Sequence, residues 1–326
     1  VHGKNFYPDM IMETGNKSIH VSVLSGGIGP EREVSLSSGQ ALADALQQHY
    51  KVDLIDLSEA KVPQSLDPRS TIVFPVIHGT FGEDGSLQAM LDERGFSYAG
   101  STSGASRLCM NKVEAKKVVG QKGVRVADDL FFEDPQSLDL DEVLHKLGPD
   151  LVLKPTDQGS SVALYMVSGE SELRNALNQL SFGNWMLERR IFGREFTVGV
   201  LPEMALGIVE VIPQGGVYDY QRKYTPGSTD YKFPAVLPSH LEEELKSKAL
   251  TSFSACGCRD FARVDFIVCE DGNAYFLEVN TLPGLTATSL LPKSASCAGY
   301  DFSKLVKKLT EPAIARFSAL NLLPAA

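Results

Sequence analysis

The feature that most constrains this fold is a hairpin-like stretch, RVDFIVCEDGNAYFLEVNTLPG, at residues 263–284. Apolar runs rich in β-branched and aromatic residues flank an Asp-Gly pair, which is the usual sequence of a two-residue β-hairpin turn. If Asp271 and Gly272 form that turn, the register places Asp265 directly opposite Glu278. Two carboxylates that face each other across strands repel. The hairpin therefore needs a compensating charge at this point.

The same register gives the hairpin one polar and one apolar face. Arg263 falls opposite Asn280, and because side chains alternate with a period of two, both share the face of the two carboxylates. The residues expected on the other face are Val264, Phe266, Val268, Leu277 and Val279.

The polar face has two interpretations. In one, Asp265 and Glu278 lie on a solvated surface and each pairs with a nearby lysine. In the other, Asn280 adds a third oxygen ligand on the same face and the set binds a divalent cation. Mg²⁺ typically takes one or two carboxylates, while phosphates and water fill the other positions. Because a cation converts the repulsion into binding, we favour a Mg²⁺ site that also holds a phosphate ligand.

Candidate phosphate ligands lie elsewhere in the chain. Lys154 ends an apolar strand and precedes the small-residue loop Gly159-Ser160-Ser161, whose backbone N–H groups suit phosphate oxygens. The other candidate cations are Lys112 and Lys223. Each feature is weak evidence alone, so the phosphate site depends on their joint occurrence with the acidic hairpin.

Composition limits the classes of partner. The 326 residues carry a formal net charge of -10 with a pI near 5.2, which argues against a nucleic-acid partner because such proteins usually present basic patches. No apolar run approaches the ~20 residues that span a bilayer, and the first residues lack the apolar core of a signal peptide. The five cysteines show no zinc-site spacing, so we expect reduced thiols in a cytoplasmic protein.

The order of sequence patterns over residues 18–103 predicts an open α/β domain. Strand, helix, strand, strand, helix and strand follow one another, and the run TIVFPVIHG is apolar throughout, as in strands buried in a parallel sheet. We assign residues 1–103 to this N-terminal domain, with residues 1–17 as an extension.

The rest of the chain predicts α+β structure. A helix is expected at 105–122, followed by strands and a second helix in a module that spans residues 104–190. A C-terminal domain, residues 191–326, contains further strands, a helix and the hairpin. Its polar stretch at 218–232 has no clear period, and long irregular stretches inside compact domains often act as lids.

Seven blocks of sequence, in order, resemble the motifs of D-alanine:D-alanine ligases, members of the ATP-grasp superfamily. The blocks, which extend from about residue 19 to residue 310, are GGIGPEREVSLSSG, VIHGTFGEDGSLQAML, MNKVEAKK, LKPTDQGSSV, LERRIFGREFTVGVL, DYQRKYTPGSTDYKFPA and ARVDFIV with LEVNTLPGLTATSL. The resemblance implies a three-domain α/β ATP-grasp architecture with an α+β C-terminal part and ATP between the central and C-terminal domains. It also implies a cytoplasmic enzyme that joins two D-alanine molecules for peptidoglycan synthesis, and homodimers are usual in the family.

The resemblance assigns the nucleotide site residue by residue. Asp265, Glu278 and Asn280 match the ligands of two Mg²⁺ or Mn²⁺ ions that bridge the ATP phosphates. The residues that match phosphate contacts are Lys112, Lys154 and Lys223, with Ser160 and Ser161 in the small-residue loop. Those that match adenine and ribose contacts are Glu188, the following residues Arg189 and Ile191, and Glu195.

The resemblance also assigns the amino-acid site. Glu31, Ser160 and Tyr224 match a hydrogen-bonded set that ties the first domain, the small-residue loop and the lid together over the substrate. The matching substrate contacts are Glu31 and His78 for the first D-alanine, Arg263 and the backbone of Gly284 for the reacting carboxyl, and Ser289 for the carboxylate of the second D-alanine.

Two positions depart from the family pattern. Ala163 replaces the last glycine of Gly-Ser-Ser-Val-Gly, and alanine does not freely take positive φ. Asn111 replaces the aspartate of the usual Met-Asp-Lys, although Lys112 is retained. Glu83, in the segment GEDG, is left out of the catalytic set as a turn or supporting residue.

Alternative functions differ in their expected sequence. The lid segment Arg222-Lys223-Tyr224 favours D-alanyl-D-alanine as the product, while a related ligase that makes D-alanyl-D-lactate or D-alanyl-D-serine is the nearest alternative. A nucleotide-binding protein without turnover fits less well, because the hairpin retains the whole polar set Arg263, Asp265, Glu278 and Asn280. A dinucleotide-binding dehydrogenase fits least, because GGIGPE lacks the spacing GxGxxG.

Overall fold

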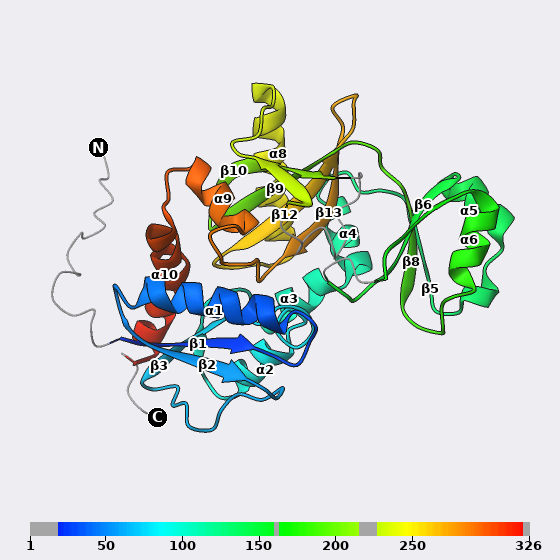
Figure 1. Ribbon diagram of the computed structural model, residues 1–326. Helices are drawn as coiled ribbons and strands as arrows, with labels where there is room; N and C mark the ends of the chain where they lie inside the picture. The colour runs from blue at the N-terminus through cyan, green and yellow to red at the C-terminus, as the bar shows by residue number, and fades with distance from the viewer. Residues whose placement is uncertain (1–18, 160–162, 215–226, 322–326) are drawn as a thin grey trace, which may run out of the picture.

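The computed structural model describes residues 19–159, 163–214 and 227–321. They form three β-sheets with helices packed on them (Figure 1). Four predicted site residues lie outside the described residues, namely Ser160, Ser161, Lys223 and Tyr224. Within the described residues, no helix is long and apolar enough to cross a membrane.

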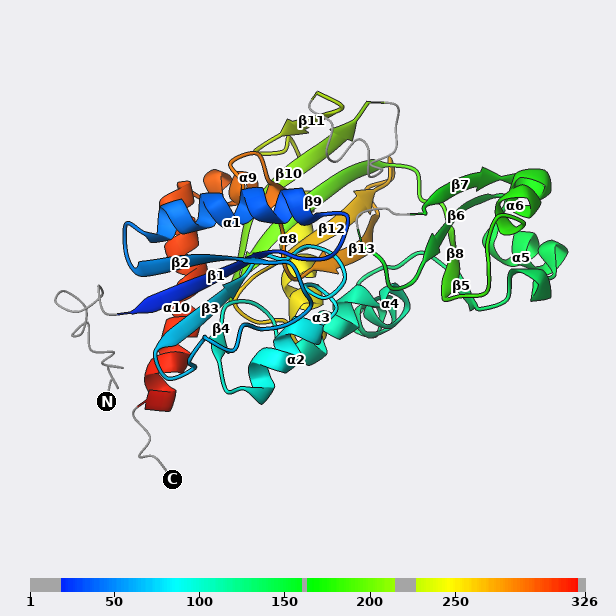
Figure 2. The same cartoon turned by 60° about the horizontal axis from the view of Figure 1, so that its bottom comes forward.

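The first sheet is parallel and has four strands in the order β2-β1-β3-β4. Its strands are β1 (His20–Gly26), β2 (Lys51–Leu57), β3 (Thr71–Pro75) and β4 (Ser97–Tyr98). With helices α1 (Arg32–Leu46) and α2 (Ser86–Glu93), they confirm the predicted order of strands and helices. Figure 2 shows α1 on one side of this sheet and α2 on the other.

The second sheet is antiparallel, with the strand order β5-β8-β6-β7. Its strands are β5 (Asp129–Phe132), β6 (Asp150–Pro155), β7 (Tyr165–Ser168) and β8 (Trp185–Arg189). The accompanying helices are η2 (Pro135–Ser137), α5 (Leu140–Leu147) and α6 (Gly169–Leu177). In Figures 1 and 2 this sheet projects from the side of the molecule, with α5 and α6 on its outer face.

The third sheet is also antiparallel, and it runs β11-β10-β9-β12-β13. Its strands are β9 (Arg194–Leu201), β10 (Met204–Pro213), β11 (Thr229–Lys232), β12 (Ala262–Val268) and β13 (Ala274–Asn280). The helices that follow its strands are α8 (Ser239–Ala255), α9 (Leu290–Cys297) and α10 (Phe302–Asn321).

The single helix expected at 105–122 is wrong, because the chain forms two helices there. Helix α3 (Ser103–Met110) ends before Asn111, which has φ -81° and ψ 101° and begins helix α4 (Lys112–Gly120). The side chain of Asn111 accepts hydrogen bonds from the backbone N–H groups of residues 113 and 114. Asparagine and aspartate are about equally good N-cap residues. The asparagine in place of the family's aspartate therefore keeps this structural role.

The hairpin β12-β13 has the predicted pairing at its polar end. Asp265 pairs with Glu278, and Arg263 pairs with Asn280. The register then shifts, and the next pair is Phe266 with Phe276. Residue 277 is therefore an extra residue on β13, which is a β-bulge.

The expected two-residue turn is wrong. Cys269 and Asn273 close a longer loop, in which the Cys269 N–H donates to the Asn273 carbonyl and the Gly272 N–H donates to the Cys269 carbonyl. The longer loop shifts the strand pairing by one residue, and the bulge shifts it back. Asp265 therefore pairs with Glu278 as predicted, although the predicted turn is incorrect.

The bulge also corrects the predicted apolar face. Phe276 is fully buried in the core of the third sheet, whereas Leu277 is only partly buried and lies among polar-face residues at the edge of a cavity. The other four predicted core residues, Val264, Phe266, Val268 and Val279, are buried as expected.

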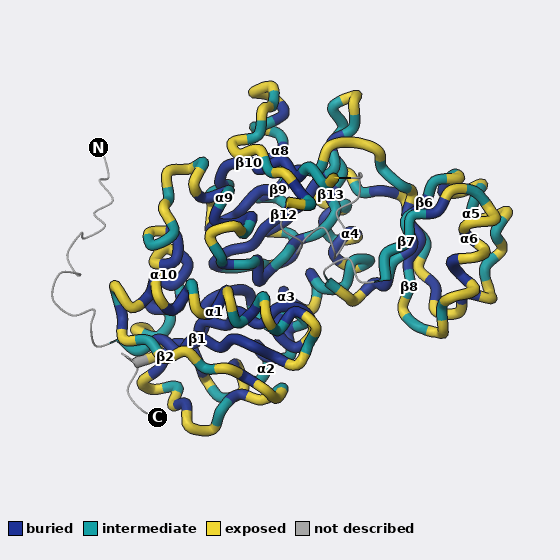
Figure 3. The backbone as a smooth tube through the Cα atoms, viewed as in Figure 1, coloured by how far each residue is buried: buried dark blue, intermediate teal, exposed yellow. Residues whose placement is uncertain are grey.

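Buried residues concentrate in the strands of the first and third sheets (Figure 3), and one apolar cluster joins the first sheet to Leu201 and Leu206, near the turn between β9 and β10. Val21 and Phe74 of the first sheet belong to the same cluster as Phe261 and Leu291 from the C-terminal half. Helix α10 completes it, and its Ala313 carbonyl accepts a hydrogen bond from the Ser97 hydroxyl of β4. The second sheet has a separate core made only of residues 132–187.

The division into three domains stays a prediction, and two segments pack across its boundaries. Helices α3 and α4, expected in the central module, contribute Cys109 and Val119 to the core of the third sheet. Helix α10, expected in the C-terminal domain, packs with the first sheet. Apolar burial joins these helices to distant parts of the chain, so sequence order does not reveal their partners.

Candidate active site

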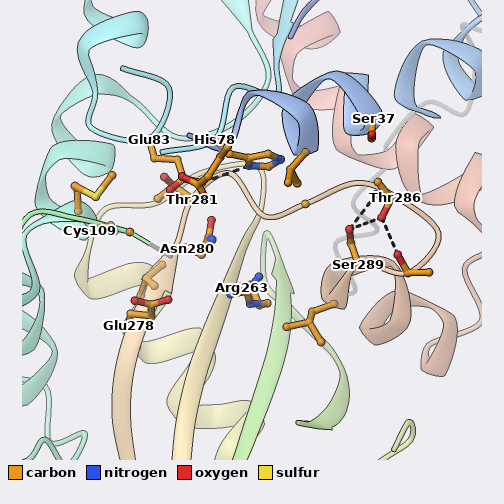
Figure 4. A pocket seen from close by; sticks show the side chains of 18 of the residues that line it. Ser37, His78, Glu83, Cys109, Arg263, Glu278, Asn280, Thr281, Thr286 and Ser289 are labelled. Carbon is orange, nitrogen blue, oxygen red and sulfur yellow. Dashed lines mark hydrogen bonds and ion pairs between the residues drawn. The ribbon is translucent and has the colours of Figure 1, made fainter. Parts of the chain in front are cut away.

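A cavity of about 330 Å³ lies where the first sheet meets the third. The predicted site residues that line it are Glu31, His78, Lys112, Arg263, Glu278, Asn280, Gly284 and Ser289. Figure 4 shows Arg263 on one strand and Glu278 and Asn280 on its neighbour facing the same space, with His78 and Glu83 across from them. We call this space the substrate cavity.

A second cavity, of about 410 Å³, lies between the second and third sheets. The predicted site residues that line it are Lys112, Lys154, Glu188, Arg189, Ile191, Glu195, Asp265 and Glu278. We call it the nucleotide cavity. Because Lys112 and Glu278 line both cavities, a ligand in one lies next to a ligand in the other.

The compensating charge at the acidic hairpin includes Arg263. Its Nε and Nη2 atoms donate to the two carboxylate oxygens of Asp265, each at 2.9 Å. Thr197 of β9 also donates to Asp265, at 2.5 Å. The arginine and the aspartate are 8% and 6% exposed, so the pair is largely removed from water. Burial and two-point contact hold both side chains in fixed positions.

The polar face retains the donor set of a divalent-metal site. Among the described residues, no three His, Cys, Asp or Glu side chains gather as a closed metal site. The predicted set differs from such a site, because its third ligand is an amide: it consists of the carboxylates of Asp265 and Glu278 and the side-chain oxygen of Asn280. The Asn280 Oδ1 atom accepts a hydrogen bond from the backbone N–H of Leu282, which fixes the amide. Such a set fits Mg²⁺ if phosphates and water complete the coordination.

A buried charge network lies at the far end of the nucleotide cavity. Glu188 is 4% exposed, and its carboxylate lies 2.5 Å from Lys154 Nζ and 3.1 Å from Lys116 Nζ. Lys116 also lies 2.5 Å from the carboxylate of Asp129. Burial alone would raise the pKa of Glu188, but the two lysines hold that pKa below its ordinary value. Glu188 is therefore an anion fixed between cations.

Sequence reasoning missed Lys116, although a signal was present. Lys116 follows Lys112 by four residues, and residues at this spacing lie on one face of a helix. Lys112 uses its Nζ to donate to the carbonyl of Gln158, at 2.6 Å. Lys112 and Lys116 thus both point towards the second sheet.

The first sheet supplies the opposite wall of the substrate cavity. Glu31 and His78 follow the carboxyl ends of the paired strands β1 and β3, where open α/β sheets usually bind ligands. The His78 ring accepts or donates one hydrogen bond with Ser38, at 3.3 Å, and lies 3.5 Å from the Glu83 carboxylate. Burial raises the pKa of Glu83, and His78 opposes that shift. Glu83, which sequence reasoning left aside, is a cavity residue.

The loop after β13 forms the cavity wall beside Arg263. Ser289 begins helix α9, and its hydroxyl accepts a hydrogen bond from the Thr286 N–H at 3.1 Å. A Cβ atom at Gly284 would lie 2.8 Å from the Ser289 hydroxyl. A side chain at residue 284 would therefore force the Ser289 hydroxyl to move.

The small-residue loop departs from the expectation for Ala163. This alanine has φ +52°, so it takes the left-handed conformation that the family's glycine would take freely. The cost for a non-glycine residue is ~1–2 kcal/mol. Residue 163 therefore takes a left-handed conformation in spite of the substitution.

Comparisons with known proteins identify the family of this chain. Residues 56–101 match the family model "D-ala D-ala ligase N-terminus", and residues 119–311 match "D-ala D-ala ligase C-terminus". The chain is 39% identical, over 302 residues, to the D-alanine–D-alanine ligase of Geobacter sulfurreducens, which covers 90% of this chain and 93% of that protein.

Solved structures show the same fold. The D-alanine–D-alanine ligase of Bacillus anthracis superposes with a TM-score of 0.81 at 32% identity, covering 93% of this chain and 99% of that one. The same enzyme complexed with ATP gives 0.80 at 30% identity, over the same shares of the two chains. The VanG D-Ala:D-Ser ligase of Enterococcus faecalis gives 0.80 at 26% identity, covering 91% of this chain and 100% of that one. The protein has the ATP-grasp fold, and the chain belongs to the D-alanine–D-alanine ligase family.

Proposed function

We propose that the protein joins two D-alanine molecules into D-alanyl-D-alanine at the expense of ATP, in the cytoplasm, for peptidoglycan synthesis. The observation that supports the proposal is the meeting of the two cavities at Lys112 and Glu278, because a nucleotide phosphate in one cavity would then lie beside a substrate carboxyl in the other. A carboxylate is a poor acyl donor, so amide formation requires activation first. Transfer of the γ-phosphoryl group gives D-alanyl phosphate, and ADP remains in the nucleotide cavity.

The nucleotide cavity fits ATP from the adenine to the phosphates. Glu188 and the backbone of Arg189 and Ile191 line the end assigned to adenine, and Glu195 lines the part assigned to ribose. Lys112 lies where the cavities meet and supplies positive charge to the phosphates. Lys154 differs slightly from its expected role, because its ammonium group pairs with Glu188. To contact the phosphates, the Lys154 ammonium group must turn away from the Glu188 carboxylate.

Asp265, Glu278 and Asn280 would hold Mg²⁺ or Mn²⁺, which supplies charge neutralisation at the phosphates. Arg263 orients the Asp265 carboxylate for this purpose, since both of its oxygens accept hydrogen bonds from the guanidinium. From the resemblance to the family, we expect this site to hold two such ions.

Arg263 and the Gly284 N–H also bind the reacting carboxyl of the first D-alanine, whose ammonium group lies towards Glu31 and His78. When the second amine attacks D-alanyl phosphate, negative charge develops on the carbonyl oxygen. A fixed donor to such an oxyanion contributes ~3 kcal/mol to lowering the barrier. Phosphate then leaves and the dipeptide remains.

The second D-alanine lies near Ser289 at the start of α9. A helix N-terminus carries partial positive charge and free N–H groups, which suit the carboxylate of this substrate. Lys223 and Tyr224 form the proposed lid over both substrates, with Glu31 and Ser160 joined to it. Exclusion of water matters because acyl phosphates hydrolyse readily.

Two further parts of the proposal come from the family. We expect a homodimer, and we expect the three-domain division described above. The lid segment Arg222-Lys223-Tyr224 favours D-alanine over D-lactate or D-serine as the second substrate, and a ligase for either of those acceptors is the alternative.

The function is tested by ADP release from the purified protein. We expect turnover with D-alanine and Mg²⁺, none with L-alanine, and none after the metal is chelated. Mass spectrometry of reactions with D-alanine plus D-lactate or D-serine then identifies the acceptor. Release of ADP that does not depend on D-alanine would contradict the proposal. Production of D-alanyl-D-serine or D-alanyl-D-lactate in preference to the dipeptide would establish the alternative.

A further inference from the structure

Three of the five cysteines gather at one junction between α3 and the third sheet. They are Cys109 on α3, Cys256 at the end of α8, and Cys258 in the loop that leads into β12. The sulfurs of Cys109 and Cys258 lie 3.6 Å apart, although 149 residues separate them in sequence. The ligase reaction proposed above uses none of these thiols.

The backbone on each side of this pair is fixed. The Gly100 N–H donates to the Asp260 carboxylate at 3.0 Å, and the Arg259 Nε donates to the Gly100 carbonyl at 2.9 Å. The Arg259 N–H donates to the Ser101 hydroxyl at 3.3 Å. These contacts tie the segment before α3 to the residues just after Cys258. The two sulfurs therefore stay close, and a small side-chain rotation brings them towards the ~2.05 Å of a disulfide bond.

The two thiols differ in their surroundings. The pKa of Cys258 is lowered by a hydrogen bond from the Cys109 thiol, although partial burial opposes the shift, and the Ser101 hydroxyl adds to the lowering. The pKa of Cys109 is raised by its contacts with Cys256 and Cys258 and by burial. Cys258 is also partly exposed, whereas Cys109 is 5% exposed. Cys258 is thus the more reactive and more accessible thiol of the pair.

We propose that Cys109 and Cys258 are a site of reversible oxidation, at which a peroxide converts the two thiols into an intramolecular disulfide. The bond would join α3 to the loop that enters β12, the strand that carries Arg263 and Asp265. Because Cys109 lines the substrate cavity, the modification lies at the wall of the proposed active site.

The chemistry requires only hydrogen peroxide as oxidant. The Cys258 thiolate attacks one peroxide oxygen, so that an S–O bond forms, the O–O bond breaks, and the hydroxide that leaves becomes water. Cys258 is now a sulfenic acid. The Cys109 sulfur then attacks the Cys258 sulfur, an S–S bond forms, and the S–O bond breaks. The departing hydroxide takes the Cys109 proton as a second water, so two thiols are oxidised and one peroxide is reduced.

The test maps disulfides in the full-length wild-type protein. The protein is treated with equimolar hydrogen peroxide, denatured, alkylated at its remaining thiols, digested without reductant and analysed by mass spectrometry. We expect a linked pair of peptides that contain Cys109 and Cys258, lost on prior treatment with dithiothreitol, while Cys269 and Cys297 are alkylated. Alkylation of Cys109 and Cys258 to the same extent as Cys297 would overturn the proposal, as would a bond to Cys256 in place of Cys258.

Two variants test the order of the steps. In Cys109→Ser the partner thiol is absent, so we expect the Cys258 sulfenic acid to persist and to be labelled by dimedone. Cys297→Ser, which changes a thiol outside the cluster, should form the Cys109–Cys258 bond as the wild type does. Dimedone labelling at Cys109 in a Cys258→Ser variant, with none at Cys258 in Cys109→Ser, would contradict the proposed roles. The wild-type map decides the existence of the bond even if a variant fails to fold.

Discussion

Lys116 is buried between the carboxylates of Asp129 and Glu188 and is 2% exposed. A cation in this position offsets two negative charges that are themselves largely removed from water. Removal of one partner of a buried ion pair leaves the other uncompensated, which typically costs ~3–5 kcal/mol. The ammonium group therefore has a structural role, and through Glu188 it also orients the adenine end of the nucleotide cavity.

We expect Lys116→Met to lower the free energy of unfolding by ~3 kcal/mol and to weaken ATP binding, because Glu188 then keeps only Lys154 as a cationic partner. The matched control is Lys117→Met on the same helix, where the side chain is 62% exposed and pairs weakly with Glu114. This control should change the free energy of unfolding by less than about 0.5 kcal/mol. Denaturant unfolding and a nucleotide titration measure both effects. Equal losses in the two variants would show that burial of Lys116 has no special importance.

Single residues were predictable from the sequence where a motif identified them, and were missed where a contact across the fold identified them. Arg263 and Asp265 share a strand face, so their proximity follows from the period of two. Lys116 of helix α4 acquires its importance from Asp129 and Glu188, which belong to the second sheet. No local pattern contains these partners. Glu83 is different, because His78 lies only five residues earlier in the same segment and a local signal was therefore present.

Among the secondary-structure elements, the hairpin β12-β13 has the predicted pairing at its polar end, although the turn from which that pairing was predicted is incorrect. The predicted two-residue turn is replaced by a longer loop, and the β-bulge at Leu277 restores the register. Sequence patterns do not fix bulges, because an extra residue changes pairing without changing composition. The bulge is what puts Leu277 beside Glu278 in the nucleotide cavity and Phe276 in the core.

The bulge leads to opposite expectations for two neighbouring residues. Phe276→Ala should lower the free energy of unfolding by ~3–5 kcal/mol, because it opens a cavity beside Phe266, 6.3 Å away between ring centroids. Leu277→Ala should cost much less stability but raise the KM for ATP, because this side chain lines the nucleotide cavity. Thermal unfolding and steady-state kinetics separate the two effects. A regular hairpin without the bulge would give the reverse pattern.

Helices α3 and α4 show a different limit of prediction. The run from residue 105 to residue 122 has helical character throughout, and only the capping geometry of Asn111 divides it. Asparagine inside a helical pattern is compatible with either a continuous helix or a cap. The hydrogen bonds that decide between them depend on where Lys112 meets the second sheet, since its N–H donates to the Thr156 carbonyl at 2.9 Å.

In the whole molecule, one apolar cluster joins the first sheet to α10 and to the connection between β9 and β10, while the second sheet has a core of its own. The rest of the third sheet packs in a further cluster with α8, α3 and α4. A contact outside the core supports this grouping. Arg316 of α10 donates to the buried carboxylate of Asp260 and to the Tyr98 carbonyl of β4. The alternation of strands and helices predicted the first sheet, but the return of α10 to that sheet could not be predicted without its partners.

Hydrogen exchange should distinguish the cluster of the first sheet from the core of the second sheet. We expect amides in β1, β3 and α10 to exchange through one common opening, because their side chains share one apolar cluster. Amides in β6 and β8 should exchange through a separate opening of lower free energy, because their core is smaller and closed on itself. Exchange followed by mass spectrometry at increasing denaturant measures both openings. A single opening for all of these elements would contradict the separate core.

We propose that carboxylates on neighbouring strands of the third sheet bind a divalent ion together with the nucleotide. The most direct test of this proposal is calorimetric titration of ADP into the protein with and without Mn²⁺, in the wild type and in the variants Asp265→Asn and Glu278→Gln. Glu270→Gln, in the exposed loop of the same hairpin, is the matched control. We predict that Mn²⁺ tightens ADP binding in the wild type and the control, and that either site variant loses at least about tenfold of this gain, or ~1.4 kcal/mol. Site variants that gain as much affinity from Mn²⁺ as the wild type does would contradict the proposal.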